Sequence, residues 1–385
     1  MNYAEASALT ILTVENGAYA GRVWREGVGP SLVSIRNGRV IDITSKKLPT
    51  MRELCETPDA AAALATSHGE DLCSINELLA ANDTSAIRLL APIDLHAVKA
   101  AGVTFASSML ERVIEEKARG DATLAAAIRA DITRLIGDDL SKLVPGSPEA
   151  MALKQSLIER NSWSQYLEVG IGPDAEIFTK AQVMSSVGFG ADIGIHPISS
   201  WNNPEPEVVI VANASGQLVG ATLGNDVNLR DVEGRSALLL SKAKDNNASC
   251  ALGPFIRFFD ETFSIADVNT MEISLEVEGE DGFHLKGANN MRKISRSPES
   301  LAAATLNKHH QYPDGFVLFC GTVFAPTQDR GQVGQGFTHH QGDKVSIANP
   351  HLGVLFNTVR STDQCPPWTF GTSHLMRNLA QRGLL

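Results

Sequence analysis

The chain has 385 residues, of which 43% are hydrophobic and 20% are charged, and its formal net charge is -11 at pH 7. This composition is typical of a folded globular protein with one large core or two domains, and it excludes an extensively disordered chain. The acidic balance, with a pI of about 5.4, disfavours nucleic acid and anionic membrane surfaces as partners and leaves small-molecule chemistry.

The sequence shows no targeting or membrane-spanning signal. The first residues, MNYAEASALTILTVENG, lack a basic region followed by a long apolar core, and no run of about eighteen uncharged apolar residues occurs. We therefore expect the protein in the cytoplasm. The five cysteines lack the C-x-x-C spacing of zinc or redox sites, so free buried thiols are expected.

Residues 1–90 are predicted to form a small N-terminal β-rich domain. Residues 20–44 alternate apolar and polar positions on both sides of Asn37-Gly38, which is a strong signal for a hairpin. Residues 45–86 contain helical spacing interrupted by polar breaks. A new apolar stretch, LLAPIDLHAVKAAGVTF, begins near residue 90, and we place the boundary to a second domain over residues 91–385 there.

The second domain is predicted to be mainly β with one helical excursion. From about residue 107 to 160 the composition turns to alanine, leucine and paired charges, which indicates amphipathic helices. From Glu168 to Arg360 the chain returns to short β-branched runs separated by Gly, Pro, Asn and Asp, typical of a large, mostly antiparallel β structure. The predicted fold class is α+β, mainly β.

Two glutamates stand one residue apart at the start of a very apolar strand. Glu205 and Glu207 lead into Val-Val-Ile-Val-Ala, and a second apolar run reaches Asp226 after a turn, which indicates a hairpin. With a two-residue turn at Ser215-Gly216, Glu205 faces Asp226, and Glu207 lies on the same face. Three converging carboxylates repel one another unless a cation neutralises them, so the pattern predicts a magnesium, calcium or manganese site. Solvated acids at a strand end are the alternative at this point.

Further motifs, in a fixed order, carry a resemblance to a known family. They are EIFTKA (176–181), NDVNLRD (225–231), SKAKDNNASCALGP (241–254), GTVFAP (321–326) and a closing GDKVSIANPHLGVLFNTV. In this order they resemble the fumarylacetoacetate hydrolase family, from roughly Lys99 to Val359. The resemblance implies a mixed β-sheet roll or barrel in which Glu205, Glu207 and Asp226 bind Mg²⁺ or Mn²⁺, in agreement with the predicted hairpin.

Within this family, longer stretches such as KAAGVTFASSMLERVIEEKARGDA and WSQYLEVGIGPDAEIFTKA are similar to the 2-keto-3-deoxy-pentonate dehydratases. Hydrolytic branches commonly carry a water-activating histidine in a short helix, where this chain has Ser107 and Ser108. The resemblance therefore implies a hydro-lyase that converts a D-xylonate-type 2-keto-3-deoxy-pentonate to 2-oxoglutarate semialdehyde through a metal-stabilised enolate. A hydrolase or decarboxylase of a diketo or 2-oxo acid, and a catalytically inactive sugar-acid binder, remain alternatives.

The same resemblance implies roles for the remaining site residues. Lys244, ten residues before Pro254, is expected to act as the base at C3 or to stabilise the enolate, because a nearby dication favours loss of its proton. Lys242 is the alternative. Glu176 is expected to orient water or to protonate the leaving C4 hydroxyl. The expected substrate-binding residues are Arg230, Gly321, Thr322, Ser107 and Ser108.

The expected partners also follow from composition and resemblance. The implied ligand is a small 2-keto sugar acid, and neither a nucleic acid nor a membrane is expected. Family members usually associate through the β domain, so a homodimer or homotetramer is implied.

Overall fold

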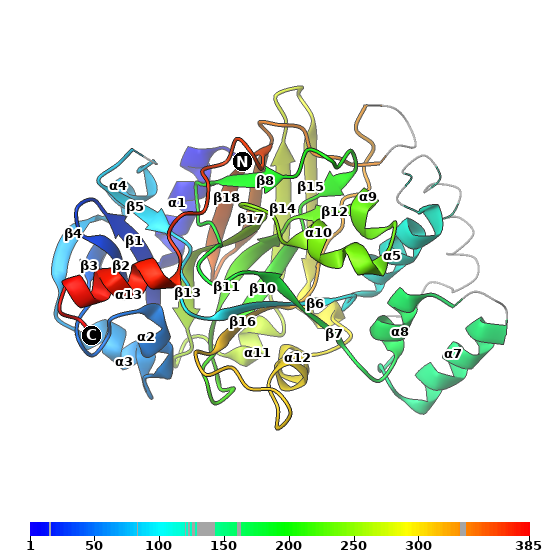
Figure 1. Cartoon of the computed structure of the whole chain (residues 1–385), viewed down its shortest axis with the longest axis horizontal. Helices are drawn as coiled ribbons and strands as arrows, with labels where there is room; N and C mark the ends of the chain where they lie inside the picture. Colours follow the sequence, from blue (N-terminus) through cyan, green and yellow to red (C-terminus); the bar gives the residue numbers. More distant parts are fainter. Residues whose placement is uncertain are drawn as a thin grey trace.

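The computed structural model describes the chain except residues 15–16, 83, 120, 122–123, 125–127, 129–142, 160–162 and 332–335, and except the side chains of residues 106–108, 110 and 115. The N-terminal strands and the last helix lie at one end of the long axis, and the helices α5, α7 and α8 lie at the other (Figure 1). Most of the other strands lie in the middle (Figure 1). No helix in the described part of the chain is long and apolar enough to span a membrane.

The first ninety residues combine short strands with short helices. These elements are α1 (Tyr3–Val14), β1 (Tyr19–Arg25), β2 (Gly29–Arg36), β3 (Arg39–Asp42), α2 (Met51–Glu56), α3 (Ala60–Thr66), β4 (Glu70–Ser74), α4 (Ile75–Leu79) and β5 (Ile87–Leu90). Arg36 pairs with Arg39, and both residues of the intervening Asn37-Gly38 turn have positive φ, as a two-residue hairpin turn requires. The predicted hairpin is confirmed.

The remaining chain alternates strands with short helices. Up to the long hairpin the elements are β6 (Ala97–Gly102), α5 (Ala106–Ala118), α7 (Pro148–Glu159), α8 (Gln165–Ile171), β7 (Glu176–Ala181), β8 (Asp192–Ile195), β9 (Asn202–Asn203), β10 (Pro206–Ala212) and β11 (Leu218–Asp226). Then follow β12 (Asn228–Leu229), α9 (Arg230–Glu233), η2 (Ala237–Leu239), α10 (Leu240–Lys244), β13 (Cys250–Phe258), α11 (Ile265–Val268), β14 (Glu272–Glu278), β15 (His284–Asn290), η3 (Met291–Lys293), α12 (Pro298–Thr305), β16 (Phe316–Phe319), β17 (Lys344–Asn349), β18 (Gly353–Ser361) and α13 (Thr372–Gln381). Helices α5 and α7 fall within the predicted helical excursion.

The strands form one long sheet, one five-stranded sheet and one short pair. The long sheet has the order β4-β3-β2-β1-β13-β11-β10-β16-β6-β7, with β5 paired to β1, and the five-stranded sheet has the order β15-β14-β17-β18-β8. Most pairs are antiparallel, while β16 with β6 and β18 with β8 are parallel. Because β1 pairs with both β2 and β13, the two predicted domains share one sheet, and their boundary near residue 90 stays a prediction.

Strand β10 explains why the run after the glutamates is apolar throughout. Val208 and Ile210 belong to the core between the two large sheets, where they meet residues of β14 and β17. Val209 and Val211 point to the other face and join a second core cluster that includes Leu54 of α2. A strand that is buried on both faces needs apolar residues at every position rather than at alternate ones.

The predicted register of the β10–β11 hairpin is right, whereas its predicted two-residue turn is wrong. Asp226 N donates to Glu205 O at 3.0 Å, so these two residues face each other. The turn runs from Asn213 to Gln217, and the Asn213 side chain accepts a hydrogen bond from Gln217 N. The turn is longer than predicted, but the pairing shifts between Val211, which faces Gly220, and Ala212, which faces Leu218. This shift compensates for the longer turn, so Glu205 still faces Asp226.

In the same sheet, Gly224 faces Glu207 across the hairpin, and a Cβ at this position would clash with the side chains of Phe319 and Val209. We expect Gly224→Ala to lower the free energy of unfolding by about 1–3 kcal/mol, the usual cost of overpacking a core. Gly371→Ala, at an open position before α13, is the matched control and should change it by less than about 1 kcal/mol. Equal urea midpoints for the two variants would contradict this packing.

Candidate active site

Three carboxylates meet at the end of the β10–β11 hairpin. Glu205 directly precedes β10, Glu207 is its second residue, and Asp226 is the last residue of β11. They are 2%, 1% and 2% exposed, and each offers an oxygen within 4.8 Å of the others. The predicted convergence of the three carboxylates is confirmed.

Lys244 places its ammonium between two of these acids. It is the last residue of α10 and is 3% exposed, and its Nζ lies 2.5 Å from Glu205 Oε2 and 3.0 Å from Asp226 Oδ2. Burial disfavours the ammonium, yet the negative charges of Asp226 and Glu205 outweigh this effect and raise the pKa of Lys244. Loss of this proton, as the sequence predicts, therefore requires another cation to engage the same carboxylates.

The two glutamates titrate in opposite directions. Burial works against ionisation of Glu205, but the charges of Arg112 and Lys244 overcome it and lower the pKa of Glu205 to about 2. For Glu207, burial and then the negative charges of Asp226 and Glu205 raise the pKa well above its usual value. Ionising Glu207 is thus costly within this cluster of acids.

The donor set fits a divalent cation. Three buried carboxylates offer the hard oxygen ligands that magnesium, manganese and calcium prefer. A dication beside Glu207 would offset the repulsion that raises its pKa. The residues that could hold the ion are therefore Glu205, Glu207 and Asp226.

Two further buried cations border the acids, and the sequence interpretation missed both. Lys180 on β7 is fully buried, with its Nζ 3.0 Å from Asp226 Oδ1. Arg112 on α5 contacts Glu205 Oε1 and lies 3.0 Å from Glu233 Oε2. Lys180 could have been found, because it lies two strand periods after Glu176 and so shares its face. No local pattern marks Arg112, whose partners are far away in sequence.

Glu176, at the start of β7, lines the same cavity as the three acids, Lys244 and Arg112. Burial raises the pKa of Glu176 to about 7, and the charge of Glu233 adds to this effect, while Arg112 and Lys244 oppose it. A carboxyl group with a pKa near neutrality can both donate and accept a proton at physiological pH. The cavity has a volume of about 20 Å³, which is room for about one water molecule, so a larger ligand requires side chains to move.

Gly321 and Thr322 hold one of the acids. Gly321 N donates to Glu207 Oε2 at 2.7 Å, and Thr322 Oγ1 lies 3.4 Å from Glu207 Oε1. Gly321 has φ +100, and a Cβ there would clash with Thr104, so glycine is needed for this approach. Their predicted contact with the substrate stays a prediction.

Three of the predicted substrate-binding residues, Arg230, Ser107 and Ser108, have no described contact with the cavity. Arg230 is 2% exposed, donates from Nε to Asn203 Oδ1 at 2.8 Å, and packs over the ring of Trp201. Arg230 is not among the described residues that line the cavity, and its predicted contact with the substrate stays a prediction. Ser107 and Ser108 lie in the first turn of α5, but their side chains are outside the described part of the structure.

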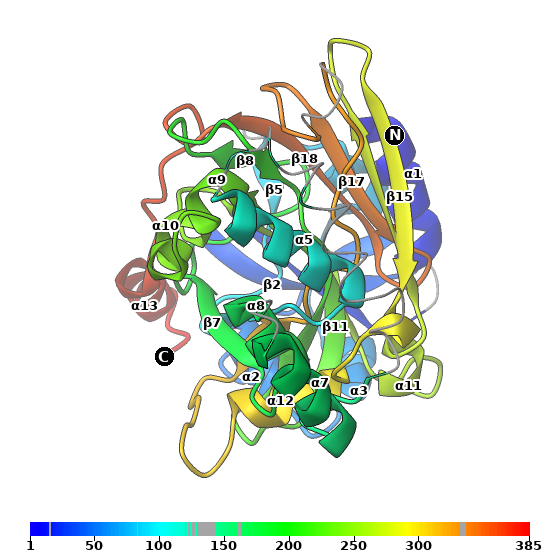
Figure 2. The same cartoon turned by 90° about the vertical axis from the view of Figure 1, so that its right-hand side faces the viewer.

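Of the two candidate lysines, only Lys244 reaches the acids. Lys242 is exposed, and its Nζ lies 3.0 Å from His196 Nε2. Figure 2 shows α10 beside α9 and α5, the helix that carries Arg112. The geometry therefore favours Lys244 over Lys242 as the lysine of the site.

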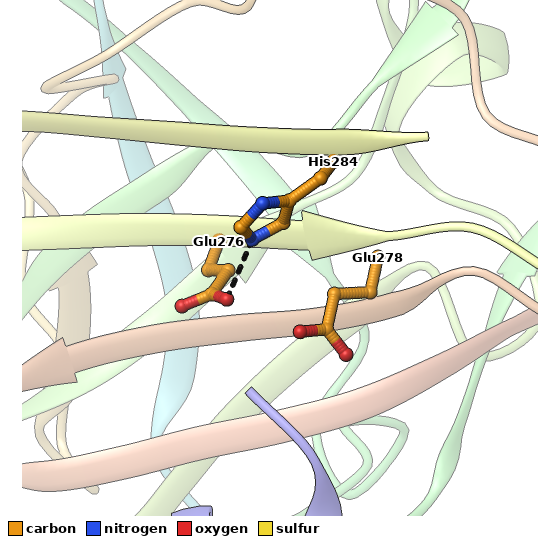
Figure 3. A group of neighbouring side chains, drawn as sticks. All are labelled: Glu276, Glu278 and His284. Carbon is orange, nitrogen blue, oxygen red and sulfur yellow. Dashed lines mark hydrogen bonds and ion pairs between the residues drawn. The ribbon is translucent and has the colours of Figure 1, made fainter. Parts of the chain in front are cut away.

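A second acidic group lies on the five-stranded sheet, far from these residues in sequence. It consists of Glu276 and Glu278 on β14 and His284 on the paired strand β15 (Figure 3). Glu276 Oε1 accepts from His284 Nε2 at 2.7 Å and lies 3.4 Å from Lys286 Nζ. The ammonium of Met1 also lies 2.6 Å from Glu276 Oε1 and 2.5 Å from Glu278 Oε1. Both glutamates are partly exposed as well, so solvent and the Met1 and Lys286 ammonium groups already offset their charges. The buried group is the stronger metal candidate.

The segment that carries this site resembles known proteins. Residues 173–360 match the family model described as fumarylacetoacetate (FAA) hydrolase C-terminal. Residues 173–360 thus resemble the C-terminal domain of fumarylacetoacetate hydrolases, and the resemblance predicted from the motifs is confirmed. The matched segment contains all three acids, Glu176 and Lys244.

Two curated relatives are each 31% identical to part of the chain. One is a 2-dehydro-3-deoxy-D-arabinonate dehydratase of Saccharolobus solfataricus, matched over 185 residues, 48% of this chain and 58% of the relative. The other is a probable 2-keto-3-deoxyxylonate dehydratase of Haloferax volcanii, matched over 194 residues, 50% of this chain and 63% of the relative. The chain thus spans about three fifths of the length of the curated relatives it matches.

Solved structures share the fold at low sequence identity. A 2-keto-3-deoxyarabinonate dehydratase is 24% identical with a TM-score of 0.63, and the match covers 89% of this chain and 99% of that one. A 2-keto-3-deoxy-D-arabinonate dehydratase complexed with magnesium and 2,5-dioxopentanoate is 23% identical, with the same TM-score and the same coverage. A 5-carboxymethyl-2-hydroxymuconate delta-isomerase from Mycobacterium smegmatis is 18% identical, with a TM-score of 0.51 and coverage of 89% and 98%. The predicted fold class is confirmed.

The raised pKa of Glu176 has a measurable effect on stability. An unfolded glutamate titrates near 4.5, so the cost of ionising buried Glu176 appears as the pH rises above 4.5 and is complete above about 7. In EDTA, Glu176→Gln should raise the midpoint of thermal unfolding by about 2 °C or more at pH 8, and by less at pH 5. Glu261→Gln, at an exposed position, is the control and should show no such pH dependence. A gain for Glu176→Gln that is equal at both pH values would contradict the shift.

Proposed function

We propose that this protein is a Mg²⁺-dependent hydro-lyase that removes water from a 2-keto-3-deoxy-pentonate and forms 2-oxoglutarate semialdehyde. The observation that carries the proposal is the grouping of three buried carboxylates with Lys244 and Glu176 around one cavity. Two curated relatives named as dehydratases of such acids support it. So does the fold neighbour complexed with magnesium and 2,5-dioxopentanoate, which is another name for 2-oxoglutarate semialdehyde.

The chemistry of the substrate defines what the residues must do. The C3 methylene is acidic because it adjoins the C2 ketone, and the C4 hydroxyl is placed to leave. Loss of a C3 proton and the C4 hydroxyl, as water, leaves a C3–C4 double bond. Transfer of a proton from C5 to C3 then gives an enol at C5, which becomes the aldehyde. Two proton-transferring groups near C3 and C4 are therefore required.

The acids and Lys244 have complementary roles in this proposal. Glu205, Glu207 and Asp226 would hold Mg²⁺, which when bound supplies an electrophile for negative charge developing on the 2-keto oxygen. With its carboxylate partners engaged, the Lys244 ammonium loses the charges that raise its pKa, so its amine can accept the C3 proton. Glu176, with a pKa near 7, can protonate the departing C4 hydroxyl.

A hydrolytic or decarboxylating enzyme of the same family, or an inactive binder, are the rival functions. Of the residues that the structure describes, none of those lining the cavity is a histidine, so the water-activating group of the hydrolytic branches is absent from this lining. An inactive binder would have no need for Lys244 and Glu176 beside the acids. These observations favour elimination.

The direct test is an assay of purified protein with Mg²⁺ and synthetic 2-keto-3-deoxy-D-xylonate or its L-arabinonate counterpart. The expected product is 2-oxoglutarate semialdehyde, detected by NMR. An acylpyruvate and a 2-oxo diacid serve as comparison substrates for hydrolysis and decarboxylation. Cleavage of either one without any aldehyde from the sugar acids would reject the proposal.

The finer properties belong to the same proposal. Manganese is proposed as an alternative metal because the donor set suits both ions. A homodimer or homotetramer and a cytoplasmic location are proposed on the sequence resemblance and composition alone.

Loss of a ligand charge should weaken the metal site. We expect Glu205→Gln, Glu207→Gln and Asp226→Asn each to lower Mg²⁺ affinity and activity by at least about tenfold, because each removes one anionic ligand. Glu276→Gln, in the second acidic group, is the matched control and should leave both unchanged. Isothermal titration with Mg²⁺ gives the affinities. If only the control variant loses Mg²⁺ binding, the metal must be reassigned to the five-stranded sheet.

Loss of Lys244 should separate catalysis from metal binding. Lys244→Met keeps most of the side-chain bulk and removes the amine, so kcat should fall about a hundredfold or more. Mg²⁺ affinity should be retained or increased, because the ammonium contacts the same carboxylate oxygens.

The matched variant Lys242→Met should be nearly neutral, since Lys242 is exposed and faces His196. A collapse of activity for Lys242→Met with normal turnover for Lys244→Met would reverse the assignment.

A further inference from the structure

Besides Lys244, other protein groups contact the carboxylates of Glu205, Glu207 and Asp226. We call them the outer groups: Lys180, Arg112, Gly321 and Thr322. Asp226 Oδ1 faces Lys180 Nζ at 3.0 Å, whereas its Oδ2 faces Lys244 Nζ at 3.0 Å. Glu205 follows the same pattern, with Oε1 on Arg112 and Oε2 on Lys244. One oxygen of each of these two acids is thus held apart from the oxygen that meets Lys244.

Glu207 is held in a comparable way. Gly321 N donates to its Oε2 at 2.7 Å, and the weaker contact of its Oε1 with Thr322 Oγ1 spans 3.4 Å. Each of the three acids thus has at least one carboxylate oxygen engaged by a donor or cation other than Lys244. Neither Lys180 nor Arg112 has a function in the reaction proposed above, and Lys180 is the more deeply buried of the two.

Burial and hydrogen bonds hold the Lys180 ammonium in one position. It is fully buried, and its Nζ donates to Val227 O at 3.3 Å and to Lys244 O. Lys244 O also accepts from Ser249 Oγ at 2.8 Å, which fixes the end of α10. The two carbonyls therefore determine where the Lys180 ammonium stands.

The contact between Lys180 and Asp226 is an ion pair rather than an aligned hydrogen bond. Asp226 Oδ1 is buried and has no hydrogen-bond donor in the described part of the chain. The Lys180 charge at 3.0 Å is thus the main attraction acting on this oxygen, and such attraction is strong where water is excluded. Without this charge, nothing described on that side of Asp226 would hold Oδ1 away from the other acids.

We infer that Lys180 is a positioning residue that keeps Asp226 a one-oxygen metal ligand and thereby biases the site toward Mg²⁺ over Ca²⁺. The inference rests on the proposed metal site. Mg²⁺ is small, octahedral and satisfied by single carboxylate oxygens with water, whereas Ca²⁺ takes six to eight oxygens and readily accepts both oxygens of one carboxylate. Freeing Asp226 Oδ1 would therefore help the larger ion more.

The test compares two affinities in the absence of substrate. Isothermal titration of the full-length protein with Mg²⁺ and with Ca²⁺ gives the ratio Kd(Ca²⁺)/Kd(Mg²⁺) for the wild type, Lys180→Met and Lys180→Gln. Removing a positive charge strengthens the electrostatic attraction of both dications alike, so the ratio, rather than either affinity, reports on how Asp226 binds. We expect the ratio to fall by at least about tenfold in both variants.

Two variants separate the effect of the charge from a general loss of structure. Lys180→Gln can still donate a hydrogen bond to a backbone carbonyl, so it removes the charge while preserving part of the local anchoring. Lys99→Met on the neighbouring strand β6 is the matched control, because its Nζ bonds Thr179 and does not reach the acids. Its ratio should equal that of the wild type.

The outcomes distinguish this inference from the proposed function. A wild type that binds Mg²⁺ together with an unchanged ratio in Lys180→Gln would overturn the role of Lys180 and leave the metal site standing. A wild type that binds neither ion would overturn both. Restoration of the wild-type ratio in Lys180→Arg, which returns the charge, would support the positioning role against a purely structural one.

Discussion

Repulsion between three buried carboxylates is the constraint on which the rest of the site depends. Glu205, Glu207 and Asp226 are almost fully removed from water, where like charges interact most strongly. Cations from three separate elements reduce this repulsion: Arg112 on α5, Lys180 on β7 and Lys244 on α10. The raised pKa of Glu207 shows that these cations do not balance all of the acids equally.

The fold keeps the three acids close together because the β10–β11 hairpin that carries them is held rigidly. Strand β10 is buried on both faces, and strands on either side hold the hairpin within the long sheet. Acids at the mouth of such a hairpin cannot move apart without disrupting the core. Because solved neighbours of this fold include both dehydratases and an isomerase, the reaction must be argued from the side chains of the site. Glu176 and Lys244 carry that argument here.

Local patterns predicted the acids well and their environment poorly. The alternation of side chains along β10 and the pairing across the hairpin correctly predicted that Glu205, Glu207 and Asp226 lie together. The turn was predicted too short, but the irregular pairing after Val211 left the register at the acids as predicted. Arg112 contacts Glu205 from 93 positions away, and a contact at such separation leaves no local signal in one sequence. The pairing of β1 with β13, which joins the N-terminal strands to the long sheet, was unpredictable for the same reason.

The most direct test of the account is a crystal structure of the protein soaked with Mn²⁺, with the ion located by its anomalous scattering. The account predicts one strong peak among the oxygens of Glu205, Glu207 and Asp226, with the Lys244 ammonium withdrawn from at least one of the two carboxylates it contacts in the present structure. A fully occupied ion on Glu276, Glu278 and His284, with no peak at the buried acids, would contradict it.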